Sequence, residues 1–277
     1  MKAAVGGYAR ARDLRHALEL LSSADGAGRV LAGGQSLVAA LNMRLTTGDV
    51  LVDIASLDEC RGVVDEGETL RIGALTRHAE IGRDPLIRTH APLLADAVGH
   101  IAHAAIRNRG TIGGAIAHAD PAAEFPACAL ALGAVMHVEG LGGRRSIPAE
   151  AFFRDTFETA LADGEILTEI SVPKAAAGEA QAIEEVARRS GDYALAGLCL
   201  VRREGRHRIA LFSVGPKPTL AAGAMAALDG GDVEAAVAAL TDEIDPPSDT
   251  QASGAYRRHL AGVLLRRVVA RIEGEAR

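Results

Sequence analysis

The sequence predicts an α+β protein with two domains, the first of them divided into two lobes. Its 277 residues exceed the roughly 100–200 residues of a usual single domain. Residues 174–182 ("KAAAGEAQA") are small and polar and lack apolar periodicity, which predicts a boundary there. Runs of helical and strand-like periodicity occur on both sides of this segment. We therefore expect domains at 1–175 and 176–277, with lobes at about 1–57 and 58–175.

The first lobe has the pattern of a small βαβ unit. Residues 13–21 predict a helix with Asp13 as its N-cap, and its apolar side chains share one face. The run 29–34 ("RVLAGG") predicts a buried strand that ends at two glycines. Ser36 is placed to cap the helix that follows, and 50–57 ("VLVDIASL") predicts another buried strand.

The second lobe begins with a strand that runs into a helix start at Thr76, within 69–81 ("TLRIGALTRHAEI"). Residues 92–106 have helical periodicity throughout. The segment 125–140 predicts a helix followed by a strand, and 164–173 ("GEILTEISVP") predicts a further strand that ends the lobe.

The last segment begins with strand-like sequence over 184–218, with turns at Gly191, Gly205 and Gly215, and closes with a long amphipathic helix over 252–272. Its first part is basic within an acidic chain. This charge fits either a solvated face or a docking surface for an acidic partner. The arginines are Arg188, Arg189, Arg202, Arg203, Arg206 and Arg208.

Composition excludes several classes of protein. Hydrophobic residues make up 48% of the chain and charged residues 24%, which is ordinary for a globular protein with a sizeable core. The net charge of −6 argues against a nucleic-acid-binding protein. No apolar run reaches the ~18 residues of a membrane span, and charges interrupt the N-terminal segment where a signal peptide would need an apolar core. We expect a cytoplasmic protein.

Cysteine and histidine spacing predicts no metal site in this chain. Cys60, Cys128 and Cys199 lie far apart, which excludes a self-contained iron–sulfur site, since such a site needs about four thiolates. Apolar neighbours make Cys128 and Cys199 candidates for buried structural thiols. His100 and His103 can share a helix face, but no third ligand accompanies them. No catalytic nucleophile is indicated either.

Two similar loops carry the strongest local signal. "AGGQS" (32–36) and "TIGGA" (111–115) each place a Gly-Gly pair after an apolar residue at a strand-to-helix junction. Such pairs permit positive φ and let backbone N–H groups form a nest for phosphate oxygens, to which a following helix adds its dipole. Two ordinary turns that bind no ligand would have the same Gly-Gly sequence pattern. The full G-x-G-x-x-G and P-loop motifs are absent.

Longer stretches resemble the FAD-binding medium subunit of molybdenum hydroxylases, the family of carbon monoxide dehydrogenase and xanthine dehydrogenase type enzymes. They are "LAGGQSLVAALNMRL", "IGALTRHAEI", "IRNRGTIGGAIAHADPAAEFPACALALGA" and "ARRSGDYALAG". The similarity continues through "IALFSVGPKP" and "DPPSDTQASGAYRRHLAGVLLRRVVARI", and so covers nearly the whole chain. It implies a two-lobed FAD-binding domain of the vanillyl-alcohol-oxidase/p-cresol-methylhydroxylase type, followed by a smaller C-terminal α+β domain.

The resemblance also implies which residues hold FAD. The two loops would clamp the pyrophosphate of FAD between them. The close approach of this pyrophosphate would then explain the glycines. Asp120 and Glu124 would lie along the ribityl chain, although Asp120 with Pro121 also fits a plain helix start. Leu167 and Tyr193 would contact the flavin ring, and Ala115 lacks the polar side chain that relatives often carry there. The loop residues are Ala32, Gly33, Gly34, Gln35, Ser36, Gly110, Thr111, Ile112, Gly113, Gly114 and Ala115.

The function implied is that of an electron-exit subunit. FAD here would receive electrons from [2Fe–2S] clusters on a small subunit, while a large subunit would carry molybdenum with molybdopterin. The resemblance also implies a dimer of heterotrimers. Two alternatives remain open. The chain can be a self-sufficient FAD-dependent oxidase of the same fold, or a nucleotide-binding module without redox function.

Overall fold

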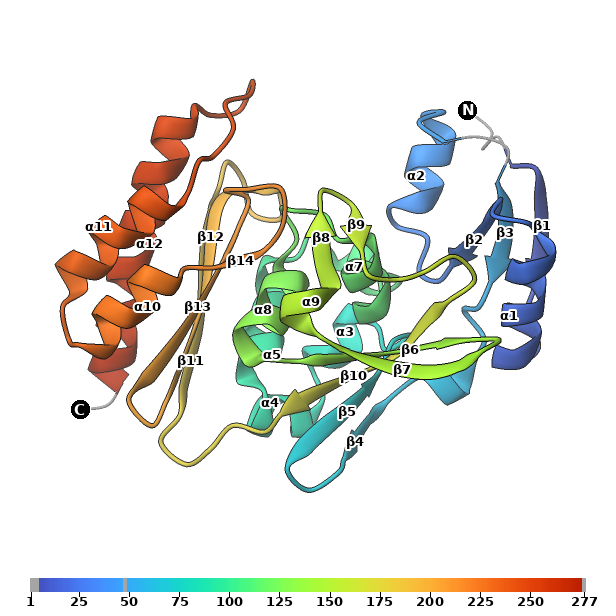
Figure 1. Cartoon of the computed structure of the whole chain (residues 1–277), viewed down its shortest axis with the longest axis horizontal. Helices are drawn as coiled ribbons and strands as arrows, with labels where there is room; N and C mark the ends of the chain where they lie inside the picture. Colours follow the sequence, from blue (N-terminus) through green and yellow to red (C-terminus); the bar gives the residue numbers. More distant parts are fainter. Residues whose placement is uncertain (1–4, 47–48, 276–277) are drawn as a thin grey trace.

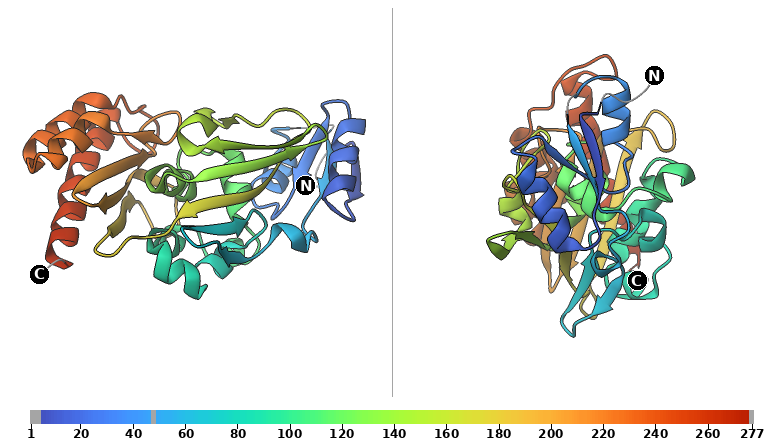
Figure 2. Two further views of the ribbon diagram at one scale, coloured as in Figure 1. Left: turned by 60° about the horizontal axis from the view of Figure 1, so that its bottom comes forward. Right: turned by 90° about the vertical axis from the view of Figure 1, so that its right-hand side faces the viewer.

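The computed structural model describes residues 5–46 and 49–275. The molecule is elongated, and three parts follow one another along its length (Figure 1). The N-terminal lobe lies at one end, a central lobe of sheet and helices comes next, and a sheet backed by three helices forms the other end (Figure 2). No helix among these residues is long and apolar enough to cross a bilayer.

The N-terminal lobe is a parallel three-stranded sheet. Its strands are β1 (Gly7–Arg10), β2 (Gly28–Leu31) and β3 (Val50–Asp53), in the order β1-β3-β2. Helix α1 (Leu14–Ser23) packs on one face, and α2 (Leu37–Asn42) follows β2. The predicted βαβ pattern is confirmed, and β1 is an additional strand that the sequence did not predict.

The two helices of this lobe begin differently, because only the first has a side-chain N-cap. The Asp13 carboxylate accepts a hydrogen bond from the His16 backbone amide at 2.7 Å, as expected for an N-cap. Ser36 precedes α2, but its side chain makes no capping hydrogen bond. Its backbone is already helical (φ −101°, ψ −51°) rather than extended, so the hydroxyl does not face the free amides. The prediction that Ser36 caps this helix was therefore wrong.

The central lobe is built on a five-stranded antiparallel sheet in the order β4-β5-β10-β6-β7. Strand β10 is the centre of the sheet because it pairs with both β5 and β6. The strands are β4 (Val63–Asp65), β5 (Thr69–Gly73), β6 (Val135–Gly140), β7 (Gly143–Pro148) and β10 (Ile166–Pro173).

Short helices cover one face of this sheet, and a small hairpin completes the lobe. A 3-10 turn, Asp58–Cys60, leads into β4. The helices are α3 (His78–Ile81), α4 (Pro85–His90), α5 (Pro92–His100), α6 (Ala104–Arg107), α7 (Ile112–His118), α8 (Glu124–Leu132) and α9 (Ala149–Phe152), and the hairpin strands are β8 (Phe153–Asp155) and β9 (Glu158–Thr159).

Three predicted helix boundaries in this lobe need correction. The helix expected over 92–106 is two helices, because Ala102 has φ +39° and ends the helical path after α5. The helix expected from Thr76 begins at His78. Asp120 does not start α8, which begins at Glu124; the Asp120 carboxylate instead accepts from the Ala122 amide in a turn.

The C-terminal part is a four-stranded antiparallel sheet backed by three helices. Strand β11 begins inside the segment predicted as a linker, because Ala182 and its neighbours are already paired with β12. The long final helix is confirmed. The elements are β11 (Ala180–Ala187), β12 (Ala194–Arg203), β13 (Arg206–Phe212), β14 (Thr219–Leu220), α10 (Ala222–Asp229), α11 (Val233–Glu243) and α12 (Gly254–Glu275).

This sheet is buried on both faces. Leu198 and Leu200 of β12 point into the core formed with α10, α11 and α12. Cys199 and Val201, which alternate with them, belong to the core of the central lobe. We call the contact between the central lobe and the C-terminal sheet the seam. The seam is an apolar core shared by both parts, which favours their behaving as one rigid body.

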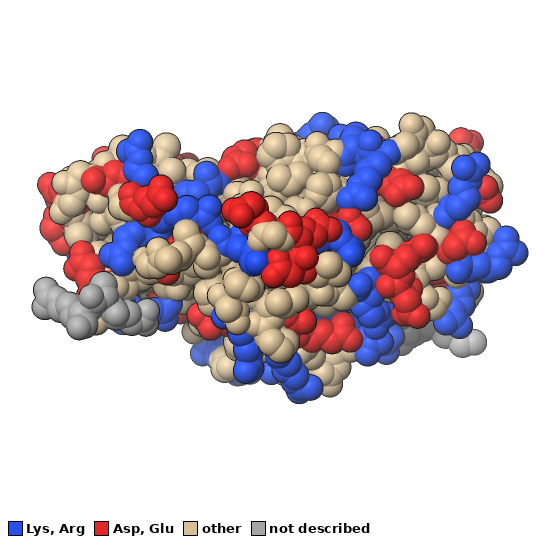
Figure 3. Space-filling model, turned by 90° about the horizontal axis from the view of Figure 1, so that it is seen from below, with Lys and Arg blue, Asp and Glu red and all other residues tan. Residues whose placement is uncertain are grey.

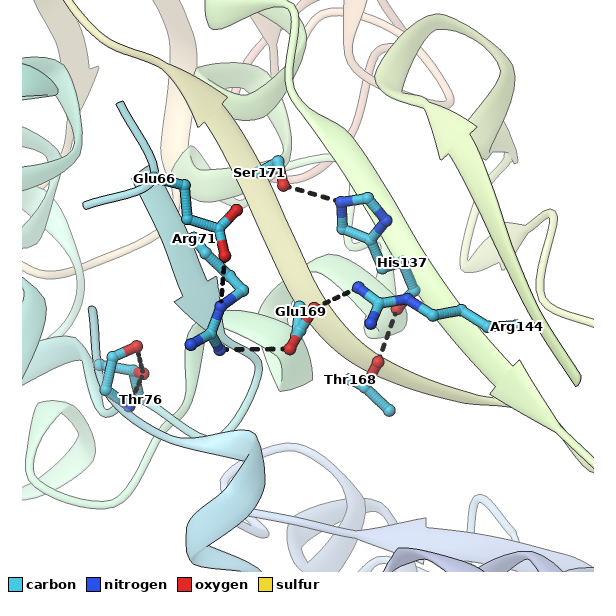
Figure 4. A network of polar contacts seen from close by, with 9 residues as sticks. Glu66, Arg71, Thr76, His137, Arg144, Thr168, Glu169 and Ser171 are labelled. Carbon is cyan, nitrogen blue, oxygen red and sulfur yellow. Dashed lines mark hydrogen bonds and ion pairs between the residues drawn. The ribbon is translucent and has the colours of Figure 1, made fainter. Parts of the chain in front are cut away.

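The other face of the five-stranded sheet is polar, and its charges pair with one another. The Arg71 guanidinium lies between Glu66 (2.9 Å) and Glu169 (3.2 Å), and Arg144 binds Glu169 from the far side (Figure 4). His137 contacts the hydroxyls of Ser146 and Ser171. On the face seen in Figure 3, basic side chains are likewise interspersed with acidic ones.

Candidate functional site

The two glycine loops lie against each other although they come from different lobes. A Cβ on Gly33 would collide with the carbonyl oxygen of Arg109 and would lie 2.9 Å from the Cα of Gly110. Only a residue without a side chain permits this approach. The structure therefore brings the loops 32–36 and 110–115 together.

A second glycine is required by another backbone contact. A Cβ on Gly113 would lie 2.7 Å from the carbonyl oxygen of Ala74, to which the Gly113 amide donates at 2.8 Å. At Gly33 and Gly113 the close neighbour is thus protein backbone. Protein backbone therefore gives a reason for glycine at these two positions, and the approach of a pyrophosphate to the loops stays a prediction. No backbone crowds Gly34, which has φ +71°, or Gly114.

The first loop holds the free hydrogen-bond donors. Within the described residues, the backbone N–H groups of residues 33–36 have no hydrogen-bond partner. In the second loop, by contrast, the three amides that follow Thr111 are already paired. Consecutive free amides in a loop form an anion-binding nest. The first loop is therefore the phosphate-binding candidate, and the second supports it.

A small cavity of about 110 Å³ lies where the loops meet. Ala32, Gly33 and Thr111 line it together with the basic side chains of Arg61, Arg77 and Arg109. The Arg61 Nε is buried and has no hydrogen-bond partner within the described residues, although it lies 3.9 Å from the Asp58 carboxylate in a longer ion pair. A buried guanidinium nitrogen needs an acceptor, and a phosphate oxygen supplies one. The site fits the pyrophosphate of a dinucleotide such as FAD.

The remaining residues of the second loop support its shape. Gly110 packs against the ring of His78, whose Cε1 would be 3.0 Å from a Cβ there. Ile112 is 1% exposed and belongs to the core. The Thr111 hydroxyl accepts from the Gly114 amide at 3.1 Å and so caps α7. Ala115 lies in the first turn of α7, where its amide bonds to the Thr111 carbonyl oxygen.

Helix α7 connects this cavity to the seam. It runs from the second loop to His118, and seven residues at 1.5 Å each span about 10 Å. Asp120 follows the helix, and Tyr193, on the turn between β11 and β12, lies beside Asp120 and is 68% exposed. Two of the predicted residues, one from each side of the seam, are thereby brought together.

Glu124 lies at the same end of α7, in the first turn of α8. Burial, and then the charge of Glu185, raise the pKa of Glu124 to about 7. Leu167 is 5% exposed in β10, and it belongs to the core beneath α7. Its position agrees with plain core packing, and a contact with the flavin stays a prediction.

Several residues of this region were not predicted from the sequence. Arg61, Arg77 and Arg109 line the cavity, and the charge of Glu185, after burial, helps to raise the pKa of Glu124. Arginines at scattered positions carry no local motif. A signal was present only for Arg109, which directly precedes the second loop in "RNRGTIGG".

The other candidates from the sequence lie outside the site. His100 ends α5 while His103 precedes α6, so the two do not share a helix face. No cluster of three or more metal-ligating side chains occurs among the described residues. The three cysteines are buried, and the Sγ atoms of Cys128 and Cys199 are 3.7 Å apart across the seam.

Three of the six arginines of the basic cluster in the C-terminal part form ion pairs within the described residues, which leaves less of the cluster available as a docking surface. Arg203 binds Glu179 at 2.6 Å, and Arg206 binds Asp229 at 3.1 Å. Arg208 donates to the last carbonyl groups of α8 and to Glu150.

A two-lobed fold with a basic cavity between glycine loops defines a dinucleotide-binding protein of the flavoprotein class. The sequence pattern of the FAD binding domain in molybdopterin dehydrogenase matches residues 3–175. That of the carbon monoxide dehydrogenase flavoprotein C-terminal domain matches residues 181–272. The chain belongs to this family and is the FAD-binding medium subunit of a molybdenum-containing oxidoreductase.

Relatives of known activity align over nearly their whole length. The carbon monoxide dehydrogenase medium chain of Hydrogenophaga pseudoflava is 35% identical over 95% of each chain. The nicotine 6-hydroxylase medium subunit of Paenarthrobacter nicotinovorans is 36% identical, over 98% of this chain and 97% of its own.

Solved structures agree with these relatives. A carbon monoxide dehydrogenase from Hydrogenophaga pseudoflava superimposes with a TM-score of 0.95 at 37% identity, over 98% of each chain. Quinoline 2-oxidoreductase from Pseudomonas putida 86 superimposes with a TM-score of 0.93 at 33% identity, over 99% of each chain.

Proposed function

We propose that this chain binds FAD non-covalently and serves as the electron-exit subunit of a three-subunit molybdenum hydroxylase in the cytoplasm. The observation that carries the proposal is the row of free backbone amides at residues 33–36, beside a cavity in which the Arg61 Nε makes no hydrogen bond with the described residues. The family match supplies the identity of the dinucleotide. We also propose domains at 1–175 and 176–277.

In this proposal each part of the site has one task. The first loop and Arg61 bind the pyrophosphate, and Thr111 holds the second loop against it. Asp120 and Glu124 accept hydrogen bonds from the ribityl hydroxyls. Leu167 and Tyr193 contact the flavin ring. FAD, when bound, supplies the redox chemistry, and the protein sets its position and electrostatic surroundings.

Partner chains supply the other centres. Two relatives are named a medium chain and a medium subunit, which supports assembly with a small and a large subunit. We propose that the small subunit carries [2Fe–2S] clusters and the large one molybdenum with molybdopterin, in a dimer of heterotrimers. Cys60, Cys128 and Cys199 are buried and belong to two different cores, which supports placing the clusters on another chain.

The cofactor site is tested with Arg61→Met, a change that keeps an apolar stem and removes the guanidinium. We expect the purified wild-type chain to show flavin absorption bands. The variant should bind FAD about 10-fold to 150-fold more weakly, since one charge-assisted hydrogen bond is worth about 1.5–3 kcal/mol. Affinity is measured by quenching of flavin fluorescence.

Arg29→Met is the matched control, because Arg29 is an exposed arginine on β2 that pairs with Asp49. It should leave the affinity for FAD unchanged. A colourless chain that binds other nucleotides would favour the non-redox module. A yellow isolated chain that oxidises an organic substrate would favour the self-sufficient oxidase.

A further inference from the structure

One arginine of the last helix holds the strand that follows Tyr193. Arg257 lies in the first turn of α12, and its Nη1 donates to the carbonyl oxygens of Leu195 (2.7 Å) and Ser213 (3.2 Å). Its Nη2 donates to the Asp249 carboxylate at 2.7 Å. Arg257 is 6% exposed, and its bonds to the two carbonyl groups are buried. One side chain thus joins α12, β12 and the loop that follows β13.

An arginine at this position needs such bonds. The first turn of a helix has free N–H groups and the positive end of the dipole, which disfavour a cation. Burial of a guanidinium costs further free energy unless acceptors satisfy it. The Arg257 Nε makes no hydrogen bond within the described residues, so the two Nη atoms carry the contact. An apolar side chain would pack there at a lower cost, and we attribute the arginine to the carbonyl groups that it holds.

The Leu195 carbonyl group lies at a β-bulge, which leaves it available to Arg257. The pairing of β11 with β12 shifts register between Val186 and Ala187, so Leu195 has no register partner among the described residues of β11. A bulge bends its strand, and bulges next to active sites redirect side chains. The chain that leads into this bulge is the turn that carries Tyr193.

The other side of the same turn is held by the segment just before α12. The Arg188 Nη1 donates to the Gln251 Oε1 at 2.9 Å. The Asp249 carboxylate accepts from the Gln251 amide at 2.8 Å and so fixes this segment as well. Residues 249–257, which we call the clamp, therefore contact the β11–β12 turn on both sides of Tyr193.

The clamp also reaches the central lobe. Ser213, whose carbonyl oxygen accepts from Arg257, has φ +63°, a left-handed conformation that a residue other than glycine rarely adopts unless its surroundings fix it. The Ser213 amide donates to the Pro121 carbonyl oxygen at 2.8 Å. Pro121 directly follows Asp120. One guanidinium therefore holds the backbone next to both Asp120 and Tyr193.

We propose that Arg257 is a positioning residue for Tyr193: through the Leu195 carbonyl group it sets where the tyrosine ring lies, and thereby how readily an external acceptor reaches the reduced flavin. This inference rests on the proposed function, in which Tyr193 contacts the flavin ring. Tyr193 is 68% exposed, so its position depends on the backbone that carries it. Arg257 is buried, and its effect on the flavin passes through that backbone.

The test compares flavin-loaded full chains of the wild type, Arg257→Met, Tyr193→Ala and the double variant. Stopped-flow absorption at equal flavin content gives the rate at which oxygen reoxidises the reduced flavin. Arg257→Met should change this rate by about 2-fold or more, in the same direction as Tyr193→Ala, since residues of one network couple at this strength. In the Tyr193→Ala chain, Arg257→Met should change the rate no further, a pattern that a general loss of stability does not produce.

Arg258→Met is the matched control, because Arg258 is the next residue of α12 and its Nη2 donates to the Ile244 carbonyl oxygen at 3.0 Å instead. It should leave the rate unchanged. Gln251→Ala is a second variant, which removes an exposed side chain of the clamp and serves where Arg257→Met does not fold. It should change the rate in the same direction as Arg257→Met, by a smaller factor.

A second measurement needs no flavin. Hydrogen exchange followed by mass spectrometry should show faster exchange over residues 188–195 in Arg257→Met than in the wild type, and no change in Arg258→Met. Unchanged exchange in Arg257→Met would overturn this inference. A flavin-loaded chain in which Arg257→Met leaves the reoxidation rate unchanged, or acts independently of Tyr193→Ala, would overturn this inference alone. A chain that binds no flavin would overturn the proposed function as well.

Discussion

At the residue scale, the glycines of the two loops have different reasons to be glycine. Gly113 has backbone against the place of its missing side chain, so Gly113→Ala should force α7 away from Ala74. We expect a loss of about 1–3 kcal/mol in the free energy of unfolding, the usual cost of overpacking. Urea unfolding followed by circular dichroism measures it.

The control for this prediction is Gly142→Ala in the turn between β6 and β7. A Cβ there would meet nothing within 4 Å. Its stability should stay within about 0.5 kcal/mol of the wild type. Equal stability of both variants would mean that the contact with Ala74 does not require glycine.

Two buried titratable groups make opposite contributions to stability as pH changes. Burial lowers the pKa of His78 to about 4, so the unfolded chain takes up this proton first and acidification below pH 6.5 destabilises the fold. Burial raises the pKa of Glu124 to about 7, so the unfolded chain loses this proton first. Raising the pH from 4.5 to 7 therefore destabilises the fold through Glu124.

We compare the free energy of unfolding of Glu124→Gln with that of the wild type. The difference should shift in favour of the variant by about 3 kcal/mol as the pH rises from 4.5 to 8, since each pKa unit is worth about 1.36 kcal/mol. Urea unfolding at several pH values measures the difference between the two chains. A pH-independent difference for Glu124→Gln would show that Glu124 titrates normally.

His78→Phe, which keeps an aromatic ring against Phe125, should instead gain stability over the wild type as pH falls below 6.5.

At the element scale, the turn between β11 and β12 is the part of the C-terminal sheet that reaches Asp120 of the central lobe. Gly191 has φ +83°, and a Cβ on it would lie 2.7 Å from the carbonyl oxygen of Ala102. This contact anchors the turn on the bend after α5. Tyr193, two residues on, is exposed and available to cover a flavin ring.

We therefore expect Tyr193→Ala to keep most of its FAD but to change the rate at which the reduced flavin is reoxidised by an external acceptor or by oxygen. Stopped-flow absorption at equal flavin content measures the rate. Tyr256→Ala is the control, because Tyr256 is an exposed tyrosine on α12. Equal reoxidation rates in all three chains would leave Tyr193 as packing.

At the scale of the whole molecule, the buried seam makes the central lobe and the C-terminal sheet one support for a cofactor. Coexpression with an iron–sulfur and a molybdenum subunit should give one complex with two copies of each chain, since each chain lacks the centres of the others. Sedimentation measures the stoichiometry. The chain expressed alone is the control and should show no substrate oxidation; turnover by it would contradict the need for partners.

Local pattern predicted most elements because their signals are short-range. Asp13 caps α1 as expected, and both the apolar alternation of β10 and the continuous apolar run of β12 are visible in the sequence. Helix boundaries were less predictable. The break at Ala102 depends on packing of the β11–β12 turn against it, and the helical backbone of Ser36 depends on the loop before it, so neither follows from residue type.

By itself, the sequence determined the family, the order of the elements and the two glycine loops, because these depend on residue type and spacing along the chain. Only the tertiary structure decided what each glycine is for, since the neighbours of Gly33 and Gly113 come from distant segments. It also decided that Arg61, Arg77 and Arg109 line one cavity with the two loops, because these residues come from separate segments that meet only once the two lobes have packed together.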